Sequence, residues 1–399
     1  MKILMVTPYL PFPPASGGQI RTLNLLKYLS KNNEITLVCL YKYESEKKYV
    51  SHLQSFCRNI YLCKRAENPW KLNLILRAIF STQPFLIVRN FSTEAQLKLK
   101  TILESEKFDV IHAETFYVMP HIPKTKIPIL LVEQTIEFKV YQHFVNSISP
   151  ILKPFFYIDI LKLKFWEQYY WKKATRVATV SESDKKIVNK IEPNIVPSVI
   201  PNGAGAEMIS HVFWEKDLTK PQLLFQGNFL WLQNTEAAIY LTSNVFPKII
   251  SEFPNATLTI AGQNINKVAK RFKKQNGVKV IDIPADKSSA VKKLYRSSTL
   301  FLAPIFGPGG TRLKILAAMA SGLPVISTST GFEGLNIVDK KHALIAESVE
   351  GFIEQIKYAL SNKKRYEDIR LNAHILIENE YNWEKIAEKL VNTYKEITN

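Results

Sequence analysis

The chain has 399 residues, 46% of them hydrophobic, which is typical of a globular protein with about two domains. Its formal net charge is +18, most of it in the first half, and this indicates an anionic partner such as a phosphorylated small molecule or a membrane surface. The basic residues are scattered and form no basic, aromatic platform, so nucleic acid is not expected as a partner.

The cysteines and the first residues of the chain indicate the cellular compartment in which the protein is expected. Cys39, Cys57 and Cys63 are odd in number and form no CxxC pair, which favours a reducing environment and argues against a structural metal site. Residues 1–6 form an apolar run that is too short for a signal peptide, and no stretch reaches the ~18 apolar residues of a membrane span. We therefore expect a cytoplasmic protein.

The first predicted element is a buried parallel strand at residues 2–7, followed by a proline-rich loop and a helix from about Arg21. Gly17 and Gly18 precede this helix and form a candidate loop for an anion or a sugar. A proline-stiffened connection without a ligand is the alternative. A strand at 34–40 follows, and then segments with a helical pattern.

Two further predicted strands, 108–112 and 127–133, carry titratable residues near their carboxyl ends. His112 and Glu114 lie at the carboxyl end of the first strand, and Glu133 and Glu137 at the carboxyl end of the second. Open α/β sheets bind ligands at this edge, so these side chains are candidates for a site. The alternative for each one is that it caps the next helix.

The segment 145–174 combines apolar and aromatic residues at helical spacing with lysines. Two interpretations stay open: a helix in the membrane interface with its lysines on anionic lipid, or a long core helix whose lysines reach solvent. The lysines are Lys153, Lys162, Lys164, Lys172 and Lys173.

A hinge is predicted at 196–205, where prolines and Asn202-Gly203 interrupt the pattern. A second series of strands then alternates with helices, and the chain ends on an amphipathic helix. Alternation of strands and helices on both sides of a hinge predicts an α/β protein with two doubly wound domains that face each other across a cleft.

The stretch 303–335 is the strongest local signal. Its glycine loop, with Gly309 and Gly310, opens into a predicted helix that begins at Thr311, and such a helix start presents free N–H groups to an anion. Arg312 and Lys314 lie in the first turn, where cations are unfavourable unless an anion binds beside them. The alternative is an ordinary strand–loop–helix connection with two solvated bases.

Several common motifs are absent from the sequence. There is no GxxxxGK[ST], no Asp-x-Asp, no HExxH and no GxSxG. An anion bound by this chain would therefore be held mainly by backbone N–H groups and by arginine and lysine side chains, without a metal ion.

Taken in order, several segments resemble the retaining, metal-independent glycosyltransferases of the GT-B fold, family 4. They include PYLPFPPASGGQIR, DVIHAE, VATVSESD, the PNG hinge, GNFLWLQNTEAA, GPGGTRLKILAAMASGLPVIS and YNWEKIAEKL. The resemblance implies two Rossmann-like domains: residues 1–198 would bind the acceptor and residues 199–378 the nucleotide-sugar donor. Residues 379–399 would form a helix that packs back on the first domain.

The resemblance also implies site residues. Glu114, Arg312 and Lys314 would be catalytic. The donor diphosphate would lie against Gly17, Gly18, Gly309, Gly310, Thr311, Arg312, Leu313 and Lys314. The base and ribose would lie near Gly262, Ile283, Pro284 and Ala317, and the acceptor near Arg21, Glu133 and Glu137. The implied activity is transfer of a sugar from a nucleotide-diphosphate sugar to a lipid-linked or saccharide acceptor in cell-surface glycan synthesis, without a cofactor, at the inner face of the membrane.

The sequence departs from the family pattern at a pair of glutamates separated by seven residues, whose positions are held by Gly309 and Ala317. The second glutamate grips the ribose in that family, so here the ribose would be held elsewhere, for example by Glu333. Two alternatives follow: a weakened or inactive homologue that serves as a partner subunit, and another GT-B enzyme such as a nucleotide-sugar epimerase.

Overall fold

The computed structural model describes residues 1–205, 208–209, 213–272, 274–284, 287–307 and 311–398. The chain forms two compact units. Unit 1 comprises Met1–Pro201 together with Ile386–Asn399, and unit 2 comprises Asn202–Lys385. Among the described residues, no helix is both long and apolar enough to cross a membrane.

Unit 1 is built on a parallel sheet whose seven described strands have the order β3-β2-β1-β4-β5-β6-β7. The central strand β1 (Lys2–Thr7) is buried at every position after the first, as its apolar sequence predicts. The other strands are β2 (Glu34–Tyr41), β3 (Asn59–Lys64), β4 (Val110–Glu114), β5 (Ile129–Glu133), β6 (Arg176–Thr179) and β7 (Ser198–Val199).

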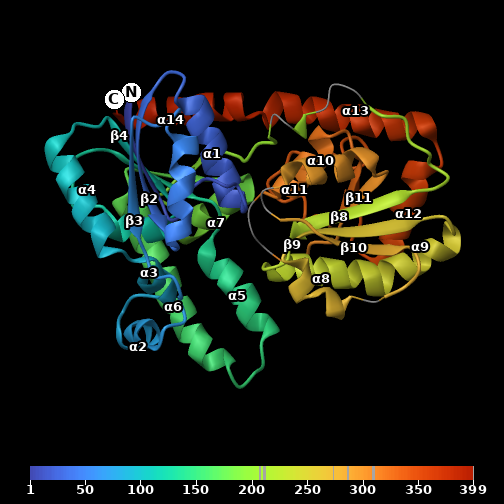
Figure 1. Cartoon of the computed structure of the whole chain (residues 1–399), viewed down its shortest axis with the longest axis horizontal. Helices are drawn as coiled ribbons and strands as arrows, with labels where there is room; N and C mark the ends of the chain where they lie inside the picture. Colours follow the sequence, from blue (N-terminus) through green and yellow to red (C-terminus); the bar gives the residue numbers. More distant parts are fainter. Residues whose placement is uncertain (206–207, 210–212, 273, 285–286, 308–310, 399) are drawn as a thin grey trace. The chain divides into compact units, whose positions relative to one another are not determined.

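Helices connect these strands and cover the sheet (Figure 1). They are α1 (Gly17–Leu29), η1 (Glu44–Leu53), α2 (Leu72–Phe80), α3 (Phe85–Asn90), α4 (Thr93–Ser105), η2 (Phe116–His121), α5 (Glu137–Ser147), α6 (Lys153–Lys173), α7 (Glu182–Ile191) and α14 (Trp383–Thr398). Helix α14 belongs to unit 1 from Ile386 onward, so the C-terminal end of the chain packs with its beginning.

The local structure differs from the sequence prediction at three places in unit 1. Helix α1 begins at Gly17, because the Ser16 side chain accepts a hydrogen bond from the Gln19 N–H and caps the helix there. Gly17 and Gly18 are therefore its first turn and not a loop. The stretch 145–174 is divided between α5 and α6, with Pro154 at the start of α6. Strand β3 and helix α4 had no sequence prediction.

Unit 2 contains a second parallel sheet, whose six described strands have the order β10-β9-β8-β11-β12-β13. They are β8 (Gln222–Asn228), β9 (Thr257–Gln263), β10 (Val278–Asp282), β11 (Leu300–Ala303), β12 (Val325–Ser327) and β13 (Leu344–Ile345). The helices are α8 (Leu232–Tyr240), η4 (Leu241–Val245), α9 (Phe246–Glu252), η5 (Ile265–Lys267), η6 (Ala269–Arg271), α10 (Ser288–Ser297), α11 (Leu313–Ala320), α12 (Val349–Leu360) and α13 (Lys363–Glu380).

Each unit has its own hydrophobic core between sheet and helices. Both sheets place a first strand at the centre and reverse the strand order beside it, between β1 and β4 and between β8 and β11. This is the doubly wound arrangement, in which ligands bind at the carboxyl ends of the strands near the reversal. The predicted α/β fold with two Rossmann-like domains is confirmed.

Candidate functional site

The start of helix α11 in unit 2 is the first part of the candidate site. Arg312 is the residue before the helix, has extended backbone angles, and donates a hydrogen bond from Nη2 to the Gly307 carbonyl oxygen at 2.6 Å. Thr311 is buried, and the first turn contains no acidic residue. The predicted diphosphate contacts Gly309 and Gly310 lie outside the described residues.

Lys314, in the first turn of α11, is a cation held inside unit 2. Its ammonium group donates a hydrogen bond to Asn234 Oδ1 and lies 4.9 Å from the centre of the Phe225 ring. Among the described residues, no carboxylate oxygen lies within 4.0 Å of it. Burial, and then the nearby charge of Arg312, lower the pKa of Lys314 to about 7. Two cations at a helix start whose first turn has no acidic residue are the arrangement expected where an anionic ligand binds.

Strands β8 and β9 approach each other closely near their carboxyl ends. Gly262 in β9 has a φ of +141°, and a Cβ atom there would lie 1.8 Å from the Gly227 carbonyl oxygen in β8. Only glycine fits at such a contact. The buried Ile283 donates its N–H to the Gly262 carbonyl oxygen at 3.0 Å, and the next residue, Pro284, is exposed. Ala317 is half-buried on α11, one turn after Lys314.

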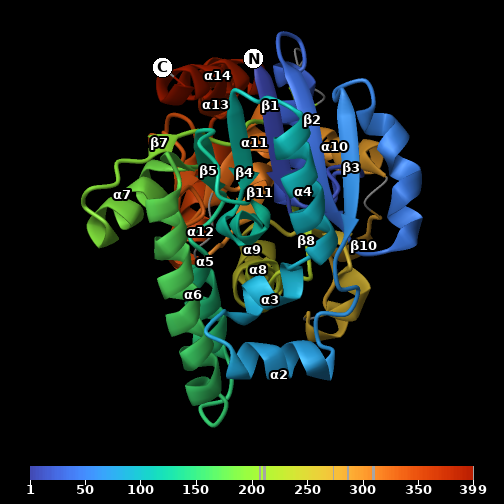
Figure 2. The same ribbon diagram turned by 90° about the vertical axis from the view of Figure 1, so that its left-hand side faces the viewer.

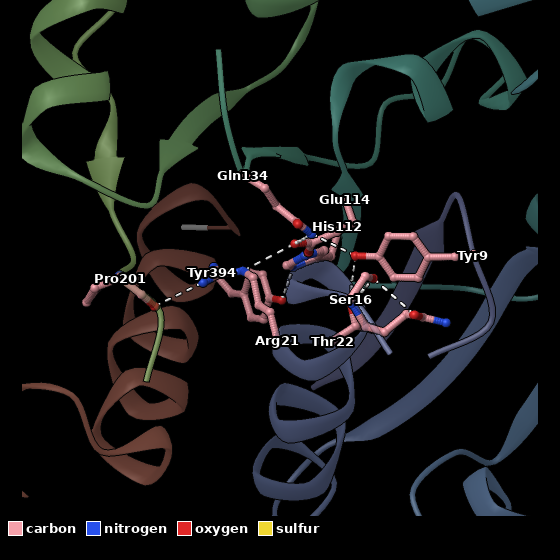
Figure 3. A network of polar contacts seen from close by, with 10 residues as sticks. Tyr9, Ser16, Arg21, Thr22, His112, Glu114, Gln134, Pro201 and Tyr394 are labelled. Atoms are coloured by element: carbon pink, nitrogen blue, oxygen red, sulfur yellow. Dashed lines mark hydrogen bonds and ion pairs between the residues drawn. The ribbon is translucent and has the colours of Figure 1, made fainter. Parts of the chain in front are cut away.

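Glu114, at the end of β4, is the centre of a buried polar network in unit 1 (Figure 3). Its carboxylate accepts hydrogen bonds from Arg21 Nε at 3.2 Å, from Gln134 Nε2 at 2.7 Å, and from the ring of His112. Although burial opposes ionisation, the hydrogen bond and charge of His112, then Arg21, give Glu114 a lowered pKa. Glu114 is therefore an internal anion with a full set of partners.

Two segments from distant parts of the chain complete this network. Arg21 Nη1 donates to the Pro201 carbonyl oxygen at 2.9 Å, and the hydroxyl of Tyr394 in α14 contacts His112 Nδ1 at 2.5 Å (Figure 3). Pro201 is the last residue of unit 1 before unit 2, and α14 is the helix by which the chain returns. Within unit 1, Pro201 and helix α14 are thus both held by side chains that meet at the carboxyl end of β4.

Gly18 allows α1 to approach the end of β5. A Cβ atom at Gly18 would lie 2.5 Å from the Tyr9 hydroxyl and 2.7 Å from Gln134 Oε1. The same tyrosine hydroxyl accepts a hydrogen bond from Gln134 Nε2 at 2.7 Å. Gly18 is therefore fixed by packing at the carboxyl edge of the sheet, the edge at which the sequence predicted a ligand.

A second group of carboxyls, Glu133, Glu137 and Glu167, comes from the end of β5, the start of α5 and helix α6. Glu133 is fully buried and accepts a hydrogen bond from Trp171 Nε1 at 2.9 Å, and Glu167 accepts the N–H groups of Glu137 and Phe138 at 2.8 and 3.2 Å. Burial, and then the charge of Glu137, raise the pKa of Glu133 to about 8. Burial raises the pKa of the half-buried Glu137 to about 7.

The structure places two of the predicted acceptor residues in the interior of unit 1. Arg21 and Glu133 were expected to contact an acceptor, but both are fully buried and engaged by internal partners. Arg21 pairs with Glu114 inside unit 1, whereas burial raises the pKa of Glu133 to about 8, so this carboxyl is mostly protonated at neutral pH. Asn234, Phe225 and Tyr394 were missed by the sequence prediction, since they meet their partners across 80 or more residues and no local pattern marks them.

Comparison with known sequences finds a family model that matches part of unit 2. Residues 220–362 match the family model described as Glycosyl transferases group 1. Over 98% of both chains, the protein is 26% identical to an uncharacterized 44.6 kDa protein in the cps region of Klebsiella pneumoniae. It is 27% identical to an uncharacterized glycosyltransferase of Methanocaldococcus jannaschii, over 78% of this chain and 81% of the other.

Solved structures match over nearly the whole chain. A sucrose-phosphate synthase from Thermosynechococcus elongatus has a TM-score of 0.74 at 13% identity and covers 100% of this chain and 99% of its own. TarM has a TM-score of 0.71 at 10% identity over 98% of both chains, and Anabaena HepE in complex with UDP and glucose has 0.65 at 11%, over 99% and 100%. At these identities the likeness shows the fold, which is GT-B. Together with the matched domain it supports a GT-B glycosyltransferase.

Proposed function

We propose that this protein transfers a sugar from a nucleotide-diphosphate sugar to a saccharide or lipid-linked acceptor in the synthesis of a cell-surface polysaccharide. The observation that carries the proposal is the pair of cations Arg312 and Lys314 at the start of α11, whose first turn contains no acidic residue. The relatives' printed names add support, since one lies in a cps region and another is called a glycosyltransferase.

In the proposed reaction, the bond between the sugar C1 and the donor phosphate oxygen breaks, and a bond from the acceptor hydroxyl oxygen to C1 forms on the same face. The acceptor proton passes to the leaving diphosphate, and the configuration at C1 is retained. Negative charge grows on the diphosphate as the bond breaks, and Arg312, Lys314 and the helix N–H groups would stabilise it there. These groups supply the charge that a metal ion provides in other transferases.

Unit 1 would hold the acceptor at the carboxyl edge of its sheet. We propose that Glu114 acts as a positioning residue, because its carboxylate is occupied by Arg21, His112 and Gln134. The half-buried Glu137 remains our candidate for an acceptor contact. Gly17 and Gly18 remain our candidates for phosphate contacts in the first turn of α1.

Calorimetry with UDP, GDP and ADP, followed by a donor screen with a polyprenyl-linked acceptor read by mass spectrometry, tests the proposal. UDP is the first candidate, since the HepE and TarM structures carry it in their titles. Arg312→Ala and Lys314→Met are expected to abolish transfer, and turnover retained by both variants would refute their role. Binding of none of the nucleotides would refute the donor site.

The half-buried Ala317 favours one alternative, a weakened homologue that serves as a partner subunit. A methyl group cannot hold the ribose hydroxyls, as the glutamate of related enzymes does. If ribose lies beside this position, Ala317→Glu should strengthen UDP binding by about 1.5–3 kcal/mol, the range for hydrogen bonds to a charged group. Nucleotide binding without transfer to any acceptor in the screen would favour the alternative.

We further propose that unit 1 docks on an anionic membrane. Helices α2 and α6 and the turn before α6 expose large apolar side chains, and these elements project from the sheet on the same side (Figure 2). We call this the α2–α6 surface; it comprises Leu72, Leu76, Ile79, Phe80, Ile151, Leu152, Phe155, Ile158, Leu161 and Phe165. Phe80 is 84% exposed and Phe155 is 74% exposed. Exposed apolar area of this kind, with lysines around it, suits the interface of an anionic bilayer.

Lys162, one of the lysines predicted to contact lipid, forms hydrogen bonds within unit 1 instead. Lys162 Nζ donates to the carbonyl oxygens of Ala78, Ile79 and Ser81 at 2.8, 3.2 and 2.7 Å, and it thereby caps the end of α2. It joins α2 to α6, so it should be left intact when membrane binding is tested. Lys172 pairs with Glu192 at 2.8 Å, so Lys153, Lys164 and Lys173 are the lysines that remain for lipid headgroups.

Flotation with vesicles of anionic and of zwitterionic lipid tests this surface. Phe80→Ser combined with Phe155→Ser should reduce binding to anionic vesicles strongly. Leu97→Ser is a matched control, because Leu97 is 61% exposed on α4 of the same unit. Equal binding of the double variant and the wild type would contradict the proposal.

A further inference from the structure

Three basic side chains meet at the carboxyl edge of the unit 1 sheet. Lys42 directly follows β2, Arg65 directly follows β3, and Arg89 lies in the last turn of α3. The pairing of β2 with β3 sets Tyr41 opposite Lys64, and the Arg65 N–H donates to the Tyr41 carbonyl oxygen at 2.9 Å. The strand register therefore brings Lys42 and Arg65 side by side.

Side-chain contacts tie the third cation to this pair. Arg65 Nη1 donates a hydrogen bond to Asn90 Oδ1, and Asn90 is the neighbour of Arg89 in α3. Arg89 Nη2 donates to the Tyr141 hydroxyl of α5 at 2.8 Å. Four segments of the chain thus converge on one cluster, which we call the 42/65/89 cluster.

The charge of Arg89 acts on the carboxyls of Glu137 and Asp159, but neither forms an ion pair with it. Within the described part of the chain, no carboxylate oxygen lies within 4.0 Å of Lys42, Arg65 or Arg89. The Glu46 carboxylate accepts hydrogen bonds from the backbone N–H groups of Lys42 and Tyr43 at 3.0 and 2.8 Å. It therefore binds backbone groups and not the side chains of the cluster. By contrast, the nearby Lys64 has carboxylates of Glu44 and Glu67 at 3.1 and 3.0 Å.

Arg65 also keeps an unused donor. Its Nε is buried and has no hydrogen-bond partner among the described residues, while Nη1 is taken by Asn90. An unsatisfied buried donor on a guanidinium is costly unless a ligand accepts from it. The Nε edge of a guanidinium matches two oxygens of a phosphate, which is why arginine is used to bind phosphates.

Repulsion among the three basic side chains also indicates that an anion binds here. Burial, and then the charges of Arg65 and Arg89, lower the pKa of Lys42. Burial, with Arg89 adding to it, also lowers the pKa of Arg65. An anion placed among the three groups would relieve this repulsion.

We propose that Lys42, Arg65 and Arg89 bind the phosphate or diphosphate group of the acceptor. The inference rests on the proposed function, since it names the chemical class of the acceptor of that reaction: a saccharide or prenyl chain that carries a phosphate or diphosphate. The cluster lies on the same unit and the same sheet edge as the residues that would receive the acceptor. The reaction that supplies this acceptor is then one that attaches a phosphate or diphosphate to a lipid or a saccharide.

Calorimetry with geranyl diphosphate, a soluble diphosphate ester, tests binding directly. Because α11 of unit 2 is itself a proposed diphosphate site, the measurement is made in the double variant Arg312→Ala/Lys314→Met. One site should remain there, and adding Arg65→Gln and Arg89→Gln should weaken it about 10- to 100-fold. Loss of all binding in the double variant, or binding indifferent to Arg65→Gln and Arg89→Gln, would overturn the proposal.

Controls separate this site from the donor site and from lipid. Arg58→Gln is matched to Arg65→Gln, because Arg58 precedes the same strand β3 and is exposed at its other end. Arg65→Gln in the otherwise unchanged chain should keep UDP affinity and the wild-type melting temperature. Inorganic pyrophosphate and neutral octyl glucoside are further probes: pyrophosphate should compete with geranyl diphosphate, and octyl glucoside should not. Competition by the glucoside alone would mean that the prenyl chain, not the diphosphate, is bound, which also overturns the proposal. Failure of UDP to bind would instead contradict the proposed function.

Discussion

The lowered pKa of Lys314 predicts that the affinity for UDP depends on pH. In the free protein its pKa is lowered to about 7 by burial and by Arg312, and its ammonium group faces Asn234 Oδ1. A bound diphosphate adds negative charge beside it and therefore raises its pKa. The complex keeps a proton that the free protein has partly lost, so binding takes up a proton above pH 7 and affinity must fall as pH rises.

The size of the effect follows from the charged fraction of the free protein. With a pKa of about 7, roughly a quarter of Lys314 is charged at about pH 7.5 and roughly one hundredth at about pH 9. UDP affinity should therefore fall roughly 25-fold over this interval, which is about 1.9 kcal/mol. The terminal phosphate of UDP titrates near about pH 6, so its own ionisation contributes little in this range.

The assay is titration calorimetry with UDP at several pH values, in two buffers that differ in ionisation enthalpy, so that proton uptake is counted directly. Lys314→Met should bind UDP more weakly at pH 7.5 and show a nearly flat profile up to pH 9. The exposed Lys293 on α10 supplies the control variant Lys293→Met, which should keep the wild-type slope. Equal slopes for wild type and Lys314→Met would refute the assignment of the proton to Lys314.

Three further predictions concern stability and are checked by chemical denaturation. Glu114→Gln should cost about 3–5 kcal/mol, since it removes one partner of a buried ion pair with Arg21, and a loss below about 1 kcal/mol would contradict the buried network. Gly262→Ala should cost more than about 2 kcal/mol because its Cβ meets a carbonyl oxygen at 1.8 Å, whereas Gly351→Ala, whose nearest atoms are at 3.5 Å, should be tolerated. Glu133 has a pKa raised from 4.5 to about 8, so the folded state holds a proton that the unfolded state releases between these values. Stability should fall as pH rises through this window, and Glu133→Gln should flatten the fall; an unchanged profile would contradict the assignment.

The outcome for the lysines of 145–174 illustrates how far a local pattern reaches. Helical spacing predicted a helix there, and α5 and α6 are helices. The same pattern treated its five lysines as equivalent, yet Lys162 caps α2 and Lys172 pairs with Glu192 at 2.8 Å. Periodicity defines the face of a helix, but partners such as Ala78, 84 residues away, are set by how helices pack.

The sequence alone determined the alternation of strands and helices, the hinge region that contains the boundary at Pro201, and the position of Arg312 and Lys314 at a helix start. Each of these depends on residues a few positions apart, where apolar runs, glycine freedom and helix ends act locally. The tertiary structure decided that Arg21, Glu114 and Glu133 are internal, and that Lys42, Arg65 and Arg89 converge. Parallel strands bring their carboxyl ends together only through long crossover connections, so the neighbours of a charge at that edge, and hence its burial and its partner, are fixed by strand order and register.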